Sequence, residues 1–133
     1  MFNNKNILIT GGTGSFGQKF VETVLTNYNP TKVIIFSRDE YKHFKMFEKL
    51  KKFDDKLRFF IGDVRDSERL DFAMRDVDYV IHAAALKQVV AAEYNPTEFV
   101  KTNITGAENV IKSSIRNDVS KVIALSTDKA VSP

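Results

Sequence analysis

The 133-residue sequence predicts an α/β protein built on a doubly wound parallel sheet. Three observations carry this prediction: short apolar segments alternate with longer amphipathic ones, the apolar segments show no polar alternation, and four glycines follow the first of them. Strands that are apolar on both sides are typical of parallel sheets covered by helices on both faces. Right-handed crossovers then give the expected strand order 3-2-1-4-5, with a ligand crevice where strands 1 and 4 diverge.

A glycine-rich turn follows the first apolar segment. The run Ile7–Ile9 stops at Thr10, where the pattern T-G-x-x-G-x-x-G begins. A turn of this kind between a strand and a helix indicates a dinucleotide site, although its spacing is one residue longer than the common G-x-G-x-x-G. A triphosphate-binding P-loop would need Lys-Ser/Thr where Gln18-Lys19 stands. A nucleophile elbow would need a glycine in place of Thr13.

Each glycine of this turn has an expected task. Gly11 permits the sharp turn, Gly14 lets a pyrophosphate approach the backbone, and Gly17 lets the following helix pack closely on the strand. The phosphates would bind N–H groups at the start of that helix. A structural turn without a ligand is the alternative. The expected cofactor contacts in this segment are Gly11, Thr13, Gly14, Ser15, Phe16 and Gly17.

The remaining elements follow from length and apolar content. Further strands are expected over Lys32–Ser37, Arg58–Ile61, Tyr79–His82 and Lys121–Ser126. Helices are expected over Ser15–Asn27, from Arg38 through a lysine-rich segment ending near Lys52, from Arg65 to about Met74, briefly before Asn95, and over Pro96–Arg116.

Two of these helices have a predicted buried face. In the first helix that face comprises Phe16, Phe20, Val21, Val24 and Leu25. In the lysine-rich helix aromatic residues recur every third position, at Tyr41, Phe44 and Phe47. We expect this helix to bury its aromatic rings and to leave its lysines and His43 in solvent.

Composition narrows the function classes. The chain is 43% hydrophobic and 28% charged, which is typical of a soluble globular protein, and it contains no cysteine. It therefore has no disulfide or thiolate site, and with no signal peptide or membrane span expected, we predict a cytoplasmic protein. The net charge of +3 comes without a nucleic-acid motif, so no nucleic-acid partner is expected. Two isolated histidines predict no metal site.

The end of the second strand indicates which dinucleotide binds. Ser37, Arg38 and Asp39 lie about 20 residues beyond the glycines, and Lys42 follows a turn later. A guanidinium and an ammonium suit a 2′-phosphate, whereas Asp39 alone would suit a free 2′-hydroxyl. We therefore expect NADP rather than NAD, with Arg38 on the phosphate and Asp39 as a helix cap. The expected cofactor contacts here are Ser37, Arg38, Asp39, Glu40 and Lys42.

Three more candidate sites follow the later strands. After the third strand, Asp63 either accepts a hydrogen bond from the adenine amino group or begins the next helix, with Val64 beside it. After the fourth, the small residues Ala83, Ala84 and Ala85 allow a dinucleotide to lie against the backbone, and His82 is expected to be structural. After the fifth, Ser126, Thr127, Asp128 and Lys129 offer proton donors and acceptors, or form an ordinary polar turn.

Taken together, the segments T-G-G-T-G-S-F-G, S-R-D-E, G-D-V-R-D, H-A-A-A-L-K, E-Y-N-P, K-T-N and S-T-D-K-A resemble the extended short-chain dehydrogenase/reductases, which have a Rossmann-type fold. More narrowly, they are similar to the inverting UDP-N-acetylglucosamine 4,6-dehydratases of pseudaminic-acid and capsule biosynthesis. Lys129 is the most telling residue, because retaining sugar-nucleotide dehydratases carry Thr-Asp-Glu where this chain has Thr-Asp-Lys.

The resemblance implies NADP and a UDP-N-acetylglucosamine-type substrate. Hydride leaves sugar C4, a proton leaves C5, water leaves C6, and hydride returns to C6 with inversion at C5. The implied roles are Lys129 as base at C5, Asp128 as acid at the C6 hydroxyl, and Thr127 as hydrogen-bond partner of the C4 oxygen. Lys87 would contact cofactor and substrate, and Ser126 would contact the substrate. A homo-oligomer is also expected.

The sequence departs from this family at one point. It ends at Pro133, before the Tyr-x-x-x-Lys that family members carry. We therefore expect residues 1–133 to be the N-terminal, NADP-binding part, truncated after strand 5, without a C-terminal sugar-nucleotide part and inactive alone. Strand 5 would be an apolar edge, which predicts self-association or marginal stability. The alternatives are a non-catalytic NADP-binding sensor or scaffold, and another reductase or epimerase of the superfamily, which Asp128-Lys129 disfavours.

Overall fold

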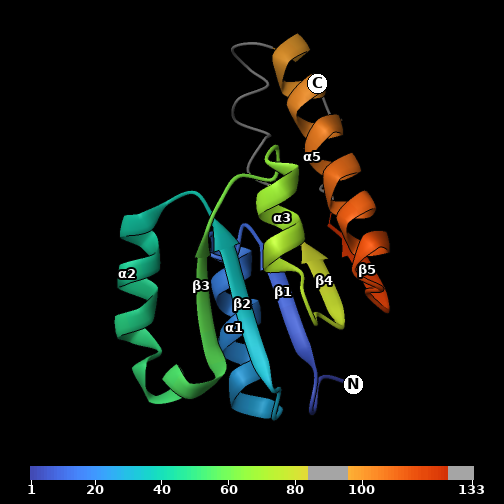
Figure 1. The fold of residues 1–133 in the computed structure, drawn as a ribbon. Coiled ribbons are helices and arrows are strands. Elements are labelled where there is room, and N and C mark those ends of the chain that lie inside the picture. The colour runs from blue at the N-terminus through green and yellow to red at the C-terminus, as the bar shows by residue number, and fades with distance from the viewer. Residues whose placement is uncertain (84–95, 126–133) are drawn as a thin grey trace.

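A computed structural model describes residues 1–83 and 96–125, with the backbone alone described for residues 96–103. Five parallel strands form one sheet in the order β3-β2-β1-β4-β5, which confirms the predicted Rossmann-type topology (Figure 1). The strands are β1 (Asn6–Thr10), β2 (Lys32–Ser37), β3 (Leu57–Ile61), β4 (Tyr79–His82) and β5 (Lys121–Ala124). The helices are α1 (Ser15–Asn27), α2 (Glu40–Lys49), the 3-10 helix η1 (Lys51–Lys56), α3 (Ser67–Ala73) and α5 (Pro96–Arg116).

Several predicted elements differ from this result in their bounds, and one lies beyond it. β3 begins at Leu57 instead of Arg58, α2 at Glu40 instead of Arg38, and α3 at Ser67 instead of Arg65. The fifth strand ends at Ala124, two residues before its predicted end at Ser126. The helical piece expected before Asn95 lies outside the described residues. No helix within residues 1–83 and 96–125 combines the length and apolar character that a membrane span requires.

Helices cover both faces of the sheet, as the apolar strands predicted. Successive side chains of a strand point to opposite faces, so β1, which is buried from Ile7 to Thr10, contributes to two cores. Ile7 and Ile9 pack in one core with residues of α1 and α2, whereas Leu8 packs in the other with residues of α3 and α5. β5 lies at the sheet edge, where Val122 and Ile123 are exposed.

The parallel register gathers the carboxyl ends of the strands at one edge of the sheet. Thr10 lies opposite Phe36 of β2 and His82 of β4, and Ser37 lies opposite Ile61 of β3. The connections that follow β1, β2 and β3 therefore leave the sheet side by side, at its upper edge in Figure 1. This edge is where a doubly wound sheet places its ligand.

The prediction for the buried face of α2 is wrong. His43 and Met46 are buried on this helix, while its three aromatic rings are exposed: Tyr41 by 66%, Phe44 by 59% and Phe47 by 38%. A period of three falls short of the 3.6 residues of a helical turn, so successive rings are displaced around α2 away from the face that buries His43 and Met46. His43 instead packs against Phe59 of β3, with ring centroids 5.2 Å apart.

The predicted face of α1 is mostly confirmed. Val21, Val24 and Leu25 are buried, and Phe20 is partly buried against the same core. Phe16 is the exception, because it is 44% exposed and stacks on Phe20 at the helix surface.

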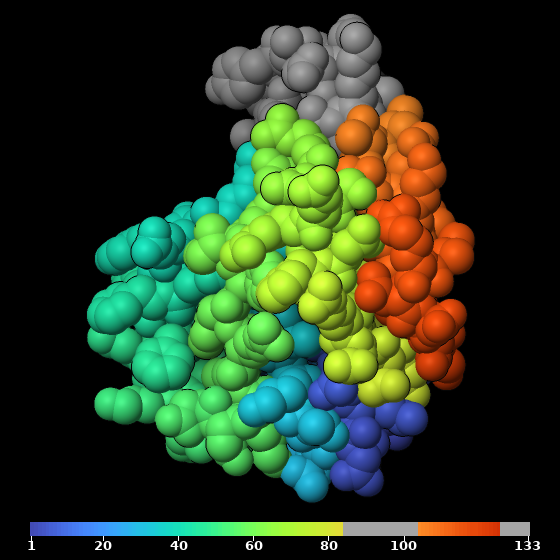
Figure 2. Space-filling view, viewed as in Figure 1, coloured from blue at the N-terminus to red at the C-terminus, as the bar shows by residue number. Residues whose placement is uncertain are grey.

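α3 and α5 lie side by side on the second face of the sheet. Arg116 at the end of α5 donates from Nη2 to Oδ1 of Asp71 in α3, at 2.9 Å. Figure 2 shows the side chains of these two helices meeting along one side of the molecule. The contact joins the C-terminal end of α5 to α3.

The turn between β1 and α1 depends on a close contact between two glycines. Gly11 has a φ of 69°, the left-handed conformation that glycine adopts without strain, as the sequence predicted. A Cβ atom on Gly17 would lie 2.5 Å from the Cα of Gly12 and 2.6 Å from its carbonyl carbon and oxygen. Gly17 therefore allows α1 to pack on the turn itself, where we had expected it to pack on the strand.

We predict that Gly17→Ala lowers the free energy of unfolding by about 2 kcal/mol, because backbone atoms of Gly12 would have to move. Urea denaturation followed by circular dichroism measures this change. Lys19→Ala, a substitution of an exposed residue on the same helix, is the control and should change stability by less than about 0.5 kcal/mol. Equal stability of the Gly17→Ala variant and the unmodified chain would contradict the close contact.

Candidate functional site

The glycine turn and the start of α1 form the first part of the candidate site. The Gly11 N–H donates to the Phe36 carbonyl oxygen at 2.9 Å, which attaches the turn to β2. Gly14 is the N-cap residue of α1, and it has no side chain that could accept a hydrogen bond from the first helix N–H groups. Uncapped N–H groups at the positive end of a helix are suited to bind phosphate oxygens. This geometry fits the expected dinucleotide.

A buried hydroxyl pair joins this turn to the end of β2. Thr13 Oγ1 lies 2.9 Å from Ser37 Oγ, and both residues are at least 95% buried. Ser37 Oγ also accepts a hydrogen bond from the Asp39 N–H at 3.2 Å. Both residues were predicted to contact the cofactor; in this structure their hydroxyl groups hold two strand–helix connections together.

The connection from β2 to α2 carries the expected charges. Asp39 caps α2, because its Oδ1 accepts from the Lys42 N–H at 3.0 Å, which confirms its predicted role as a cap. The Arg38 side chain is 67% exposed, and its Nη1 lies 3.6 Å from Oδ2 of Asp63. Glu40 and Lys42 are exposed on the first turn of α2. Two cations therefore reach solvent beside the glycine turn.

Asp63 lies at the centre of a charged cluster that the sequence analysis did not foresee. Its Oδ1 accepts from the Arg65 N–H at 2.9 Å, and its Oδ2 lies 2.8 Å from Arg65 Nη2. The hydrogen bond from the Arg65 side chain lowers the pKa of the Asp63 carboxyl, and the Arg38 charge contributes to the same shift. Asp66, rather than Asp63, caps α3 by accepting from the Arg69 N–H. The contact of Asp63 with adenine stays a prediction.

Val64 is held in place by α5. Asn109 Nδ2 donates to the Val64 carbonyl oxygen at 3.0 Å. A Cβ atom on Gly106 would lie 2.8 Å from Val64 Cγ2, so the helix approaches this connection as closely as a glycine permits. Sequence reasoning missed both helix residues, although a glycine inside a long helix pattern is a signal of close packing.

His82 is a structural residue, as predicted. It is 3% exposed, and its Nδ1 lies 2.7 Å from the Thr10 hydroxyl, which joins β4 to β1. Burial lowers the pKa of this imidazole below its ordinary value of 6.5. Ala83 is also buried, and its N–H donates to the Thr10 carbonyl oxygen at 3.1 Å.

Seven predicted site residues lie outside the described residues: Ala84, Ala85, Lys87, Ser126, Thr127, Asp128 and Lys129. The described part of the site therefore comprises the glycine turn and the connections after β2 and β3, together with Ala83 after β4.

Comparison with known proteins relates the whole chain to nucleotide-sugar enzymes. The family model described as polysaccharide biosynthesis protein matches residues 7–133. The chain is 62% identical over 133 residues to a UDP-N-acetylglucosamine 4,6-dehydratase (inverting) of Campylobacter jejuni subsp. jejuni serotype O:23/36 (strain 81-176). It is 54% identical over 136 residues to a UDP-glucose 4-epimerase of Rickettsia akari (strain Hartford). It covers 39% of the length of each of these relatives.

Solved structures share the same fold. The X-ray structure of Pen from Bacillus thuringiensis has a TM-score of 0.89 and 45% identity, covering all of this chain and 40% of that chain. The structure of DesIV (dTDP-glucose 4,6-dehydratase) from Streptomyces venezuelae, which has NAD bound, has a TM-score of 0.75 and 27% identity. That match covers 88% of this chain and 38% of DesIV.

We predict that burial of neutral His82 makes the protein less stable as the pH falls below 6.5. The unfolded chain then binds a proton that the folded chain excludes, so the free energy of unfolding decreases by at most about 1.4 kcal/mol per pH unit. Chemical denaturation at about pH 7.5 and about pH 5.5 measures the change. The change should shrink in His82→Asn and persist in Thr10→Val, which removes the hydrogen bond but keeps the imidazole. Equal pH dependence of His82→Asn and the unmodified protein would contradict this origin.

Proposed function

We propose that this chain, which belongs to the polysaccharide biosynthesis protein family, is the cofactor-binding part of an inverting UDP-N-acetylglucosamine 4,6-dehydratase. The observation that carries the proposal is its 62% identity with the Campylobacter jejuni dehydratase in an alignment that covers all 133 residues. The S-T-D-K segment supports it, because Lys129 is the residue that separates inverting from retaining dehydratases in the resemblance. The substrate is then a UDP-N-acetylglucosamine-type sugar nucleotide.

NADP is the proposed cofactor. Its pyrophosphate would bind at the start of α1, where the N–H groups have no side-chain cap. Its adenosine end would lie beside Arg38, whose side chain is exposed at the end of β2. Asp39, the acidic residue that would otherwise favour the free hydroxyl of NAD, uses its carboxylate to cap α2. A dinucleotide of this class is bound in the related DesIV structure, where it is NAD.

The reacting groups belong to the segment after β5. The bound nicotinamide supplies hydride transfer at sugar C4 and C6. Thr127 hydrogen-bonds the C4 oxygen, Lys129 accepts the C5 proton, and Asp128 donates a proton to the departing C6 hydroxyl. A lysine beside other cations has a lowered pKa, so a larger fraction of it is neutral at about pH 7 and able to accept a proton. Lys87 and Ser126 complete the substrate contacts.

The cellular location and the oligomeric state are also proposals. We expect a cytoplasmic protein that acts as a homo-oligomer. The exposed edge strand β5, with Val122 and Ile123 about two-fifths exposed, is a surface that further strands or a second copy would cover.

A 4-epimerase is the second candidate function. The observation that favours it is the identity of more than half of all residues with the Rickettsia akari UDP-glucose 4-epimerase. The two candidates share a dinucleotide site and a sugar nucleotide, and they differ in whether water is lost at C6.

We predict that the chain binds NADPH at least about tenfold more tightly than NADH, and that Arg38→Gln removes most of this preference. The reason is loss of a charge-assisted hydrogen bond to the 2′-phosphate, and about 1.4 kcal/mol corresponds to a tenfold change in affinity. Calorimetric titration with each dinucleotide measures both constants. Arg58→Gln, which removes the same charge from the opposite end of β3, should keep the preference. Equal affinities for NADPH and NADH in the unmodified chain would refute NADP as the cofactor.

A chimera separates the two enzyme activities. Residues 1–133 replace the matching segment of the Campylobacter jejuni enzyme, with which they are 62% identical. We predict that the chimera converts UDP-N-acetylglucosamine to a 4-keto-6-deoxy product, and that Lys129→Met lowers this rate at least about 100-fold by removing the base. Nuclear magnetic resonance of the reaction mixture identifies the product, and Lys121→Met is the matched control. Formation of a 4-epimer instead would favour the second candidate.

A further inference from the structure

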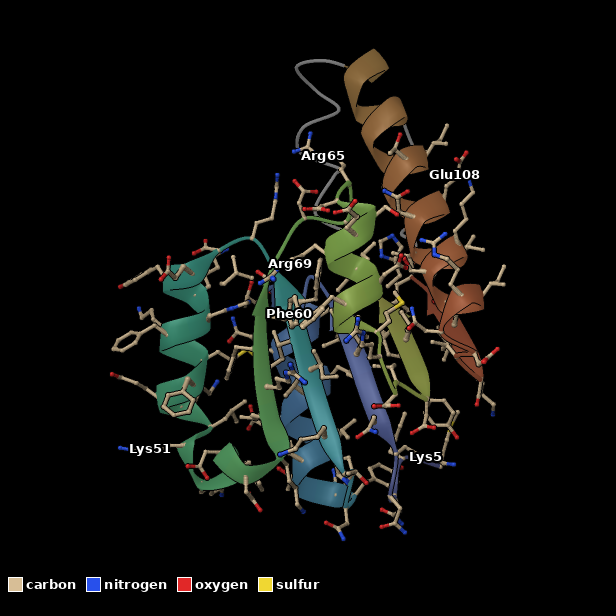
Figure 3. All side chains as sticks on the ribbon, viewed as in Figure 1. Lys5, Lys51, Phe60, Arg65, Arg69 and Glu108 are labelled. Atoms are coloured by element: carbon tan, nitrogen blue, oxygen red, sulfur yellow. The ribbon has the colours of Figure 1, made fainter. Side chains whose placement is uncertain are left out.

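Two arginines from different connections approach the same carboxylate oxygen. Arg38 comes from the connection between β2 and α2, and Arg65 comes from the connection between β3 and α3. Arg38 Nη1 lies 3.6 Å and Arg65 Nη2 lies 2.8 Å from Oδ2 of Asp63. Figure 3 shows Arg65 at the sheet edge where the chain enters α3. Asp63 thus brings two guanidinium groups together beside the glycine turn.

Two guanidinium groups share one carboxylate oxygen in this cluster. The neighbouring carboxylates Asp39 and Asp66 each accept a hydrogen bond from a helix N–H group, as the caps of α2 and α3. Two guanidinium forks can donate to two oxygens of one phosphate, whereas a neutral hydroxyl group gains little from a second cation. The cluster therefore favours a phosphomonoester dianion.

The connection that carries Arg65 is held in position before any ligand binds. The Arg65 N–H donates to Asp63 Oδ1, and the preceding Val64 carbonyl accepts from Asn109 of α5. Fixed placement of a charged group lowers the entropy that binding must remove. Arg65 is therefore presented in a defined place.

A third arginine of this region is used differently. Arg69 Nε donates to the Ile61 carbonyl oxygen at 2.8 Å, and its guanidinium lies 4.1 Å from the centre of the Phe60 ring (Figure 3). These contacts hold Arg69 against β3. Of the arginines that follow β3, Arg65 is the one that shares a carboxylate oxygen with Arg38.

We propose that Arg65 is a second specificity residue, which binds the 2′-phosphate of the dinucleotide together with Arg38. The inference rests on the proposed function, because it adds a residue to the same NADP site. It predicts that the preference for NADPH over NADH needs arginines from both connections.

The test compares Arg65→Gln with the unmodified chain in calorimetric titrations with NADPH and NADH. Two smaller probes, adenosine 2′,5′-bisphosphate and AMP, report on the adenosine end alone. We expect Arg65→Gln to weaken binding of NADPH and of the bisphosphate about tenfold while NADH and AMP binding stay unchanged. Arg65→Lys keeps the charge but loses the forked guanidinium. Its affinity for NADPH should lie between those of the unmodified chain and Arg65→Gln. Arg75→Gln removes the same charge at the far end of α3 and should have no effect.

The outcomes distinguish this inference from the proposed function. If Arg38→Gln abolishes the preference for NADPH and both Arg65 variants keep it, this inference is wrong and the NADP site stands. If the Arg65 variants weaken both dinucleotides equally, Arg65 does not read the 2′-phosphate and the inference is also wrong. If the unmodified chain binds neither dinucleotide, the proposed cofactor site and this inference fail together.

Discussion

The contact between Gly12 and Gly17 is the constraint on which the rest of the site depends. Without a Cβ atom on Gly17, α1 begins directly against the turn that leaves β1. The left-handed Gly11 reverses the chain, and its N–H bonds to Phe36 on the neighbouring strand. The helix start is thereby fixed relative to both β1 and β2. The binding site for a pyrophosphate at that helix start would then lie at a fixed distance from the residues at the end of β2 that would bind the adenosine ribose. A dinucleotide, in which the two groups are linked, requires such a fixed distance.

Side chains extend this constraint to two further connections. The Thr13–Ser37 hydroxyl pair links the glycine turn to the end of β2, and the Arg38–Asp63 ion pair links the end of β2 to that of β3. Buried hydroxyl groups are costly unless each finds a partner, so the first link also favours a single arrangement of the two turns. α5 adds support from outside the sheet through Asn109. The candidate site is therefore one continuous surface assembled from short, separately tethered segments.

Local patterns explain which features could be predicted from the sequence. The bounds of β2, β4 and α5 are those predicted, because polar or proline residues mark both ends of β2, the start of β4 and the start of α5. The buried face of α2 was not predictable from the spacing of its aromatic residues alone. Packing of the helix on the sheet buries His43 and Met46 instead. The Asn109–Val64 contact joins residues 45 positions apart, and the Arg38–Asp63 pair joins two different connections. Composition and motif spacing do not predict contacts of this kind. The residues meet because the order of the strands places their connections next to each other.

The described part of the site concerns cofactor binding, whereas the proposed reaction depends on residues outside it. The glycine turn and the residues after β2 and β3 form the proposed dinucleotide site, which both candidate enzymes would need. Relatives named as a dehydratase and as an epimerase each match the full chain at more than half of all residues, so the shared fold does not separate them. The separation depends on what a few side chains do to the C5 proton and the C6 hydroxyl. In the proposed function those side chains belong to the segment that follows β5 in the sequence. One scaffold would then bind the cofactor in both enzymes, and that segment would determine the product.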